Sequence, residues 1–162
     1  MGSGKNYAAK EDTNIPKIIQ DAIEIFSSQA EEKGIYINQD IPQIVASVNT
    51  DPSKIKQILT NLIGNAVKFT EQGGVSIRLV TDPDSHAPTE IQVSDTGIGI
   101  PQEKQKSIFE AFQQIDSGSA RKYGGTGLGL NICQSLCQLL GYRLLVRSEL
   151  GRGSTFTVFL KK

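Results

Sequence analysis

Apolar residues recur at helical spacing in three stretches of the chain. The stretches run from Ile15 to Lys33, from Asp51 to about Thr70 and from Thr126 to Leu140. Apolar residues three and four positions apart share one face of a helix, so each stretch predicts a helix with one buried side. The faces expected to be buried in the first two helices consist of Ile15, Ile18, Ile19, Ala22, Ile25, Phe26, Ala30, Ile55, Ile58, Leu59, Leu62, Ile63, Ala66 and Val67.

The ends of these helices carry recognisable signals. Asn14 and Asp51 are expected N-caps, because their short side chains can accept from free N–H groups of the first turn. Pro16 and Pro52 follow them and suit the first helical positions. Gly141 is expected to end the last helix.

Shorter segments between the helices predict strands. They are Ile35–Asn38, Ile44–Ala46, Val75–Val80, Glu90–Ser94, Tyr142–Ser148 and Ser154–Leu160. Short turns join most consecutive strands, which favours a mostly antiparallel, mixed sheet with helices on one face. We therefore expect an α+β fold, a two-layer α/β sandwich. One or two short helices are expected over 102–112 and a polar loop over 113–124.

Length and charge narrow the function classes. The 162 residues suffice for one domain, which we place at residues 15–162, after a lead-in or linker at 1–14 whose first four residues resemble a cloning remnant. Lysines and arginines number 17, as do aspartates and glutamates, so no excess charge points to nucleic acid. No run is apolar and long enough to cross a bilayer, and no signal peptide is evident.

Cysteine and histidine content argues against a zinc site. Cys133 and Cys137 lie four residues apart on one face of a predicted helix, and His86 is the single histidine. We expect two core thiols in a reducing compartment and an exposed loop histidine.

A polar stripe runs along the second predicted helix. Asn61, Asn65 and Lys68 occupy positions i, i+4 and i+7, beside the apolar face. An amide oxygen is a suitable Mg²⁺ ligand, and a lysine can hold a phosphate. The alternative is a polar helix edge whose amides bond neighbouring loops.

Asp95 ends a predicted core strand and is followed by Gly97 and Gly99. A carboxylate there can accept from the exocyclic amine of adenine, and the glycines let the chain turn against a flat ring. The alternative is a tight turn capped by Asp95.

Gly125, Gly127 and Gly129 open the third predicted helix. Free N–H groups at a glycine-rich helix start favour a phosphate, whereas a plain loop-to-helix turn is the alternative. The Walker loop and the serine/threonine/tyrosine kinase motifs are absent. Arg121 and Lys122, just before the glycines, could contact a γ-phosphate or could be ordinary surface charges. Phe109 and Phe112 could be core residues or could anchor the loop that follows them.

Five blocks in this order resemble the catalytic and ATP-binding domain of sensor histidine kinases, within the GHKL superfamily and its Bergerat fold. The blocks are QILTNLIGNAVKFT (57–70), DTGIGI (95–100), FEAFQQ (109–114), GGTGLGL (124–130) and GRGSTF (151–156). They resemble the N, G1, F, G2 and terminal glycine boxes of that family, with wording nearest to hybrid-type kinases.

The resemblance implies Mg²⁺ and ATP as cofactors and a role for each matching residue. Asn65 would bind the metal. Asn61 and Lys68 would contact the phosphates and would be the catalytic residues. Asp95 would bind the adenine amine with help from Thr155. The remaining nucleotide-binding positions would be Phe69, Gly97, Ile98, Gly99, Ile100, Arg121, Lys122, Tyr123, Gly125, Thr126, Gly127, Leu128 and Gly129. Residues 113–123 would form the ATP lid.

One departure from the wider superfamily concerns hydrolysis. ATPases such as DNA gyrase carry a glutamate where this chain has Asn61, and an asparagine cannot act as a general base. The resemblance therefore implies slow ATP hydrolysis and transfer of the γ-phosphoryl group to a histidine.

The acceptor histidine is expected on another domain. The resemblance implies, N-terminal to Lys5, a dimerisation and phosphotransfer domain of the same parent, with a receiver domain downstream. It also implies a cytoplasmic, monomeric catalytic domain without nucleic-acid or membrane contact. Two alternatives stay open: an autonomous ATPase, and a degenerate domain that binds a nucleotide or partner without transfer.

Overall fold

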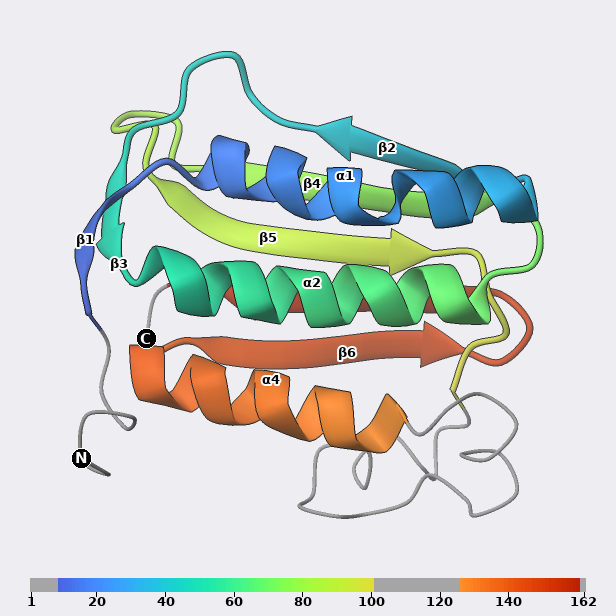
Figure 1. The fold of residues 1–162 in the computed structure, drawn as a ribbon. Coiled ribbons are helices and arrows are strands. Elements are labelled where there is room, and N and C mark those ends of the chain that lie inside the picture. Colours follow the sequence, from blue (N-terminus) through green and yellow to red (C-terminus); the bar gives the residue numbers. More distant parts are fainter. Residues whose placement is uncertain (1–8, 101–125, 161–162) are drawn as a thin grey trace.

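Three helices lie side by side over one face of a sheet in the described part of the chain (Figure 1). A computed structural model describes residues 9–100 and 126–160, with the backbone alone for 126–129. The helices are α1 Ile15–Lys33, α2 Pro52–Phe69 and α4 Thr126–Leu140, and α2 lies between the other two. All three agree with the predicted ranges; the one or two short helices predicted at 102–112 and the loop at 113–124 lie outside the described residues.

The main sheet has five strands, four of which form antiparallel pairs. In spatial order they are β2 Tyr36–Asp40, β4 Gly74–Thr81, β5 Pro88–Asp95, β7 Gly153–Phe159 and β6 Arg143–Glu149. Strand β2 runs parallel to β4, and the other neighbours are antiparallel. The predicted two-layer sandwich with a mixed sheet is confirmed.

The core fills the space between the sheet and the helices. All seven apolar residues predicted for the buried face of α2 are buried, because the helix is covered by its two neighbours and by the sheet. Ile25 on α1 is the exception to the predicted pattern, being 53% exposed. At about 100° per residue it lies at the edge of the stripe, beyond the reach of the sheet.

The caps predicted at Asn14, Asp51 and Gly141 are present. Asn14 accepts from the backbone N–H of Lys17 at 3.1 Å. Gly34 ends α1 in the left-handed region at φ 75°, and Gly141 follows α4 at φ 80°. A glycine adopts this conformation without a Cβ clash, which explains the sharp helix ends.

The strand predicted at Ile44–Ala46 is wrong. The N–H of Ala46 donates to the carbonyl of the exposed loop residue His86 at 2.8 Å, and Ile44 is 63% exposed. The strand here is β3 Val48–Thr50, which pairs with β1 Glu11–Thr13 in a separate two-stranded sheet. The predicted lead-in therefore contains a strand, whose partner lies more than 30 residues away and leaves no local signal.

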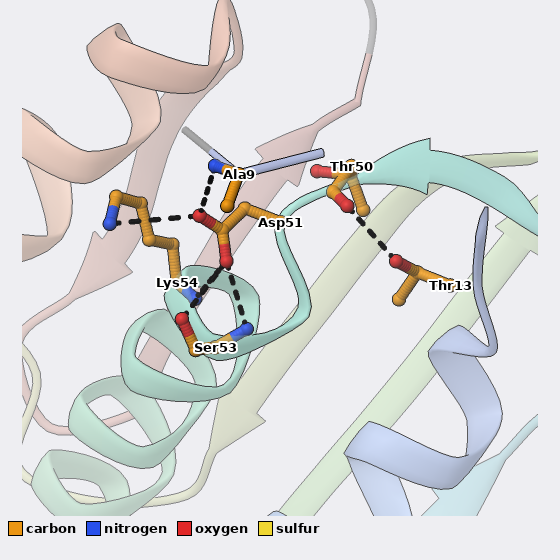
Figure 2. Close-up of polar contacts among 6 residues, drawn as sticks. All are labelled: Ala9, Thr13, Thr50, Asp51, Ser53 and Lys54. Carbon is orange, nitrogen blue, oxygen red and sulfur yellow. Dashed lines mark hydrogen bonds and ion pairs between the residues drawn. The ribbon is translucent and has the colours of Figure 1, made fainter. Parts of the chain in front are cut away.

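Asp51 joins this small sheet to the start of α2 (Figure 2). Its carboxylate accepts from the backbone N–H groups of Ser53 at 3.1 Å and Lys54 at 3.3 Å, and from that of Ala9 at 2.8 Å. Burial raises the pKa of Asp51, but the hydrogen bonds and the Lys54 ammonium outweigh it, so the pKa lies below its ordinary value. The charged form therefore stabilises the folded state.

We expect Asp51→Asn to lower the free energy of unfolding by about 1 kcal/mol at pH 7, because the cap and the bond to Ala9 weaken. A lowered folded-state pKa makes the wild-type advantage complete above the ordinary value of 3.8 and smaller as the pH falls below it. Urea unfolding from pH 7 to pH 3 measures this difference. The exposed Asp84→Asn is the control, and a deficit independent of pH would contradict the prediction.

Candidate functional site

The polar stripe predicted on α2 lies where expected, along the border of the core. Asn61 and Asn65 are half-buried, and Lys68 is exposed at the last turn. The buried residues between them fix the rotation of the helix, because seven apolar side chains face the sheet and its neighbours. The stripe therefore lies beside the buried face, with Asn61 next to Cys133 of α4.

Asn65 carries an unsatisfied buried atom. Its Nδ2 is the one buried side-chain nitrogen or oxygen without a hydrogen-bond partner among the described residues. A buried polar atom without a partner costs free energy, and an ordered water, an ion or a ligand can satisfy it. Rotation of the amide by 180° presents its oxygen in the same place, which is the ligand that Mg²⁺ takes.

Asn61 contacts α4 through Cys133. Burial raises the pKa of the Cys133 thiol to about 12, and the hydrogen bond from Asn61 only partly opposes this. The Cys133 thiol also donates to the carbonyl of Ile58 at 3.7 Å. Both cysteines are buried and free, as predicted, and Cys133 holds α4 against the face of α2 that carries Asn61.

Asp95 is a half-buried carboxylate without an ion pair in the described residues. Burial raises its pKa above the ordinary value, while the N–H groups of Gly97 and Ser154 act in the opposite direction. The N–H of Gly97 donates to Oδ1 at 2.8 Å, so the tight turn capped by Asp95, which the sequence offered as the alternative, is present. The carboxylate keeps further acceptor capacity, because two oxygens offer about four acceptor sites.

The turn after Asp95 packs tightly on its neighbours. A Cβ on Gly97 would overlap the carbonyl oxygen of Phe69 at the end of α2, and Gly99, at φ 78°, lies against the backbone of Glu149. Ile98 is 40% exposed, and its carbonyl accepts from Gly151 at 2.7 Å. The turn thus joins the ends of α2, β5 and β6, and it leaves the Ile98 side chain outward.

Thr155 lines the same hollow as Asp95, but its hydroxyl lies on the opposite face of the sheet, in contrast to the role expected for it. Its hydroxyl bonds that of Ser94 at 2.9 Å, on the face of the sheet away from the helices. Side chains alternate along a strand, so the residue opposite Asp95 that shares its face is Ser154, which is buried. Phe156 and Val158 face the core at the same spacing, and this period of two could have identified Ser154 from the sequence.

Ser154 belongs to a short chain of hydroxyls that the sequence did not indicate. Its Oγ lies 2.7 Å from the Oγ of Ser148 on β6. The Ser148 hydroxyl accepts from the backbone N–H of Ile100 at 2.7 Å. These contacts tie the end of the 95–100 turn to the two strands beside Asp95.

The glycine-rich segment is described only in part. The backbone of Thr126, Gly127, Leu128 and Gly129 forms the first turn of α4, where helix N–H groups lack partners in the helix. The other predicted residues of this region lie outside the described residues: Phe109, Phe112, Arg121, Lys122, Tyr123 and Gly125.

The elements that carry the predicted residues end on the same side of the molecule. Figure 1 shows the end of α2, the end of β5 and the start of α4 together, on the right of the view. A hollow of about 320 Å³ adjoins Asp95, Ser154 and Arg147, but it does not include Asn61, Asn65 or Lys68. It therefore covers only the Asp95 end of the candidate site.

This arrangement suits a nucleotide. It offers a carboxylate acceptor at one end, two amides and an ammonium along α2, and a helix start opposite them. In residues 9–100 and 126–160 no three histidine, cysteine or acidic side chains gather as a metal site. No helix in these ranges is long and apolar enough to cross a membrane.

Comparisons with known proteins agree with this chemistry. Residues 50–162 match the family model described as histidine kinase-, DNA gyrase B- and HSP90-like ATPase. Hybrid signal transduction histidine kinase B of Dictyostelium discoideum is 44% identical over 161 residues, which are 96% of this chain and 8% of that protein. The autoinducer 2 sensor kinase/phosphatase LuxQ of Vibrio vulnificus is 42% identical over 94% of this chain and 18% of its own length.

A solved structure extends the likeness to three dimensions. Full-length ShkA in complex with AMPPNP superposes with a TM-score of 0.78 at 33% identity, over 93% of this chain and 30% of that one. The chain thus spans less than a third of each of these relatives. On the strength of the family match and these relatives, the chain belongs to the histidine kinase-, DNA gyrase B- and HSP90-like ATPase family.

Proposed function

We propose that this domain binds Mg²⁺-ATP and donates the γ-phosphoryl group to a histidine on a separate dimerisation and phosphotransfer domain of its parent. The observation that carries the proposal is the Asp95 carboxylate, desolvated by its surroundings and without an ion pair in the described residues. A neutral N–H donor compensates such a group without adding charge, and the exocyclic amine of adenine is such a donor.

The base lies against the 95–100 turn in this proposal. Asp95 accepts from the adenine amine, and Ser154 takes the place expected for Thr155 beside it. Phe69 and Ile98 contact the flat faces of the ring, because one is half-buried at the end of α2 and the other is exposed at the turn. Gly97, Gly99 and Ile100 form the backbone wall.

The phosphates lie along α2 and the start of α4. Asn65 holds the metal, which is consistent with its unpartnered buried amide, while Asn61 and Lys68 contact phosphate oxygens. Mg²⁺, when bound, supplies positive charge that offsets the charge of the phosphates. The N–H groups of Gly125 to Gly129 bind phosphate oxygens, and Arg121, Lys122 and Tyr123 belong to the lid.

The transfer itself needs little covalent chemistry from this chain. An imidazole nitrogen of the acceptor histidine attacks the γ-phosphorus, the bond to the bridging oxygen breaks, and ADP leaves. The imidazole then loses the proton of its other nitrogen to water. Because Asn61 cannot accept a proton at neutral pH, water is not activated and hydrolysis stays slow.

The partners follow from the same proposal. The acceptor domain belongs to the parent protein, and a receiver domain takes the phosphoryl group from it. The relatives are longer proteins whose names describe hybrid and sensor kinases, which supports such neighbours. We place the isolated domain in the cytoplasm as a monomer.

We expect Asp95→Asn to weaken binding of a non-hydrolysable ATP analogue about tenfold or more, because an amide replaces one acceptor oxygen by a donor. Titration calorimetry measures this. The raised pKa means that the charged carboxylate costs stability at pH 7, so the variant without nucleotide should be as stable as the wild type or more so.

The pH dependence separates this role from a structural one. The stability deficit of wild type relative to Asp95→Asn should shrink as the pH falls through the raised pKa towards 3.8. Equal loss of stability and of nucleotide affinity would instead assign Asp95 to the turn alone.

We expect Asn65→Ala to remove the dependence of nucleotide affinity on Mg²⁺. The wild type should bind the ATP analogue more tightly with Mg²⁺ than with EDTA, and the variant about equally in both. Asn38→Ala, on the exposed strand β2, is the matched control. A variant that kept the full effect of Mg²⁺ would exclude Asn65 as the ligand.

We expect the domain, mixed with ATP and a histidine phosphotransfer domain, to form phosphohistidine faster than it releases phosphate. Labelled γ-phosphate followed on the acceptor and in solution gives both rates. Fast phosphate release without the acceptor would favour an autonomous ATPase. Nucleotide binding with neither product would favour a degenerate domain.

A further inference from the structure

The side chain of Lys33, at the last position of α1, lies over the end of α2. Its ammonium donates to the backbone carbonyls of Val67 at 2.7 Å and Lys68 at 3.0 Å. The side chain is only 23% exposed, and Nζ lies 3.9 Å from the Glu71 carboxylate. These contacts link residues 34 and 35 positions apart, between the C-terminal ends of two neighbouring helices.

The end of α2 needs these bonds, because its own cap is incomplete. The last four carbonyls of a helix lack intrahelical donors. The Thr70 hydroxyl donates to the carbonyl of Ala66 at 2.7 Å. The Thr70 backbone, however, is extended, with ψ 122°, and its N–H donates to the carbonyl of Val67 only at the long distance of 3.5 Å. In α1, by contrast, Gly34 supplies the left-handed cap. A cation near a helix C-terminus also meets a favourable dipole.

The capped turn is the turn of α2 that the proposed function uses. Lys68 belongs to it, and Asn65 lies just before it. Loss of the cap would let this turn fray, and the Lys68 side chain would then sample more conformations in the free protein. Binding phosphate would have to restrict it to one of them. An unfrayed turn avoids that entropic cost.

We propose that Lys33 is a positioning residue, which holds the last turn of α2 so that Lys68 is placed for the phosphates. The proposal rests on the proposed function. Lys33 does not contact the nucleotide itself: an ammonium has three donors, of which two meet carbonyls and the third side faces Glu71. Phe69 is held separately, through the contact of its carbonyl with Gly97.

The test is a double-mutant cycle of Lys33→Met and Lys68→Met, read by titration with a non-hydrolysable ATP analogue and with adenosine. Lys33→Met should weaken the analogue about tenfold and adenosine less than about twofold, because adenosine does not reach Lys68. When Lys68 is already replaced by Met, adding Lys33→Met should weaken binding of the analogue by less than about a further twofold. Lys33→Arg, which keeps charge and donors, should restore most of the affinity.

Controls separate positioning from stability. Lys17→Met, on the same helix and 66% exposed, should change neither affinity. In the nucleotide-free protein, amide exchange at Lys68 and Phe69 should be faster in Lys33→Met than in wild type, at a temperature where both are folded. Lys33→Gln goes through the same cycle if Lys33→Met does not fold.

The outcomes distinguish this inference from the proposed function. A wild-type domain that binds neither probe would overturn both. Normal wild-type binding, with a Lys33→Met variant that is less stable but binds the analogue equally well, would overturn the positioning role alone. Equal loss for adenosine, or additive losses in the cycle, would also overturn it.

Discussion

Burial of one face of α2 is the constraint on which the candidate site depends. The helix lies between α1 and α4 and above the sheet, and its seven apolar residues are almost fully buried. Rotation by one residue would turn about 100° of that face towards polar neighbours, so the packing fixes the rotation. The polar stripe is then fixed as well: Asn61 and Asn65 border the core, and Lys68 reaches solvent at the last turn. A hydrophobic requirement thereby sets the direction of the polar groups.

Close backbone contacts add a second constraint at the same end of the molecule. Gly97 lies against the carbonyl of Phe69, and Gly153 lies against that of Asp95, where side chains would not fit. The hydroxyls of Ser148 and Ser154 then tie the turn to β6 and β7. The turn therefore packs against the end of α2 and is hydrogen-bonded to β6, and a site assembled from distant segments requires such fixed neighbours.

Two aspartates have pKa values shifted in opposite directions by the fold. Asp51 is surrounded by donors at the start of α2, and its pKa is lowered. At Asp95 the loss of solvation on burial outweighs the hydrogen bonds from two backbone N–H groups, so the pKa of this carboxyl is raised. One carboxylate therefore stabilises the fold at neutral pH, whereas the other costs stability and keeps acceptor capacity. A costly, incompletely satisfied carboxylate at the end of a core strand is expected of a binding residue.

The sequence by itself determined the three described helices, the caps at Asn14, Asp51 and Gly141 and the buried face of α2, because these depend on residues within one or two turns. It also indicated the family and the sandwich. Only the tertiary structure showed the β1–β3 pair, the loop at Ile44, the contact between the Thr155 and Ser94 hydroxyls and the cap that Lys33 places on α2. Each of these depends on which distant strand or helix end lies alongside, and on the register between them. Such pairings are determined by the packing of the whole chain, so they cannot be predicted from the residues adjacent in sequence.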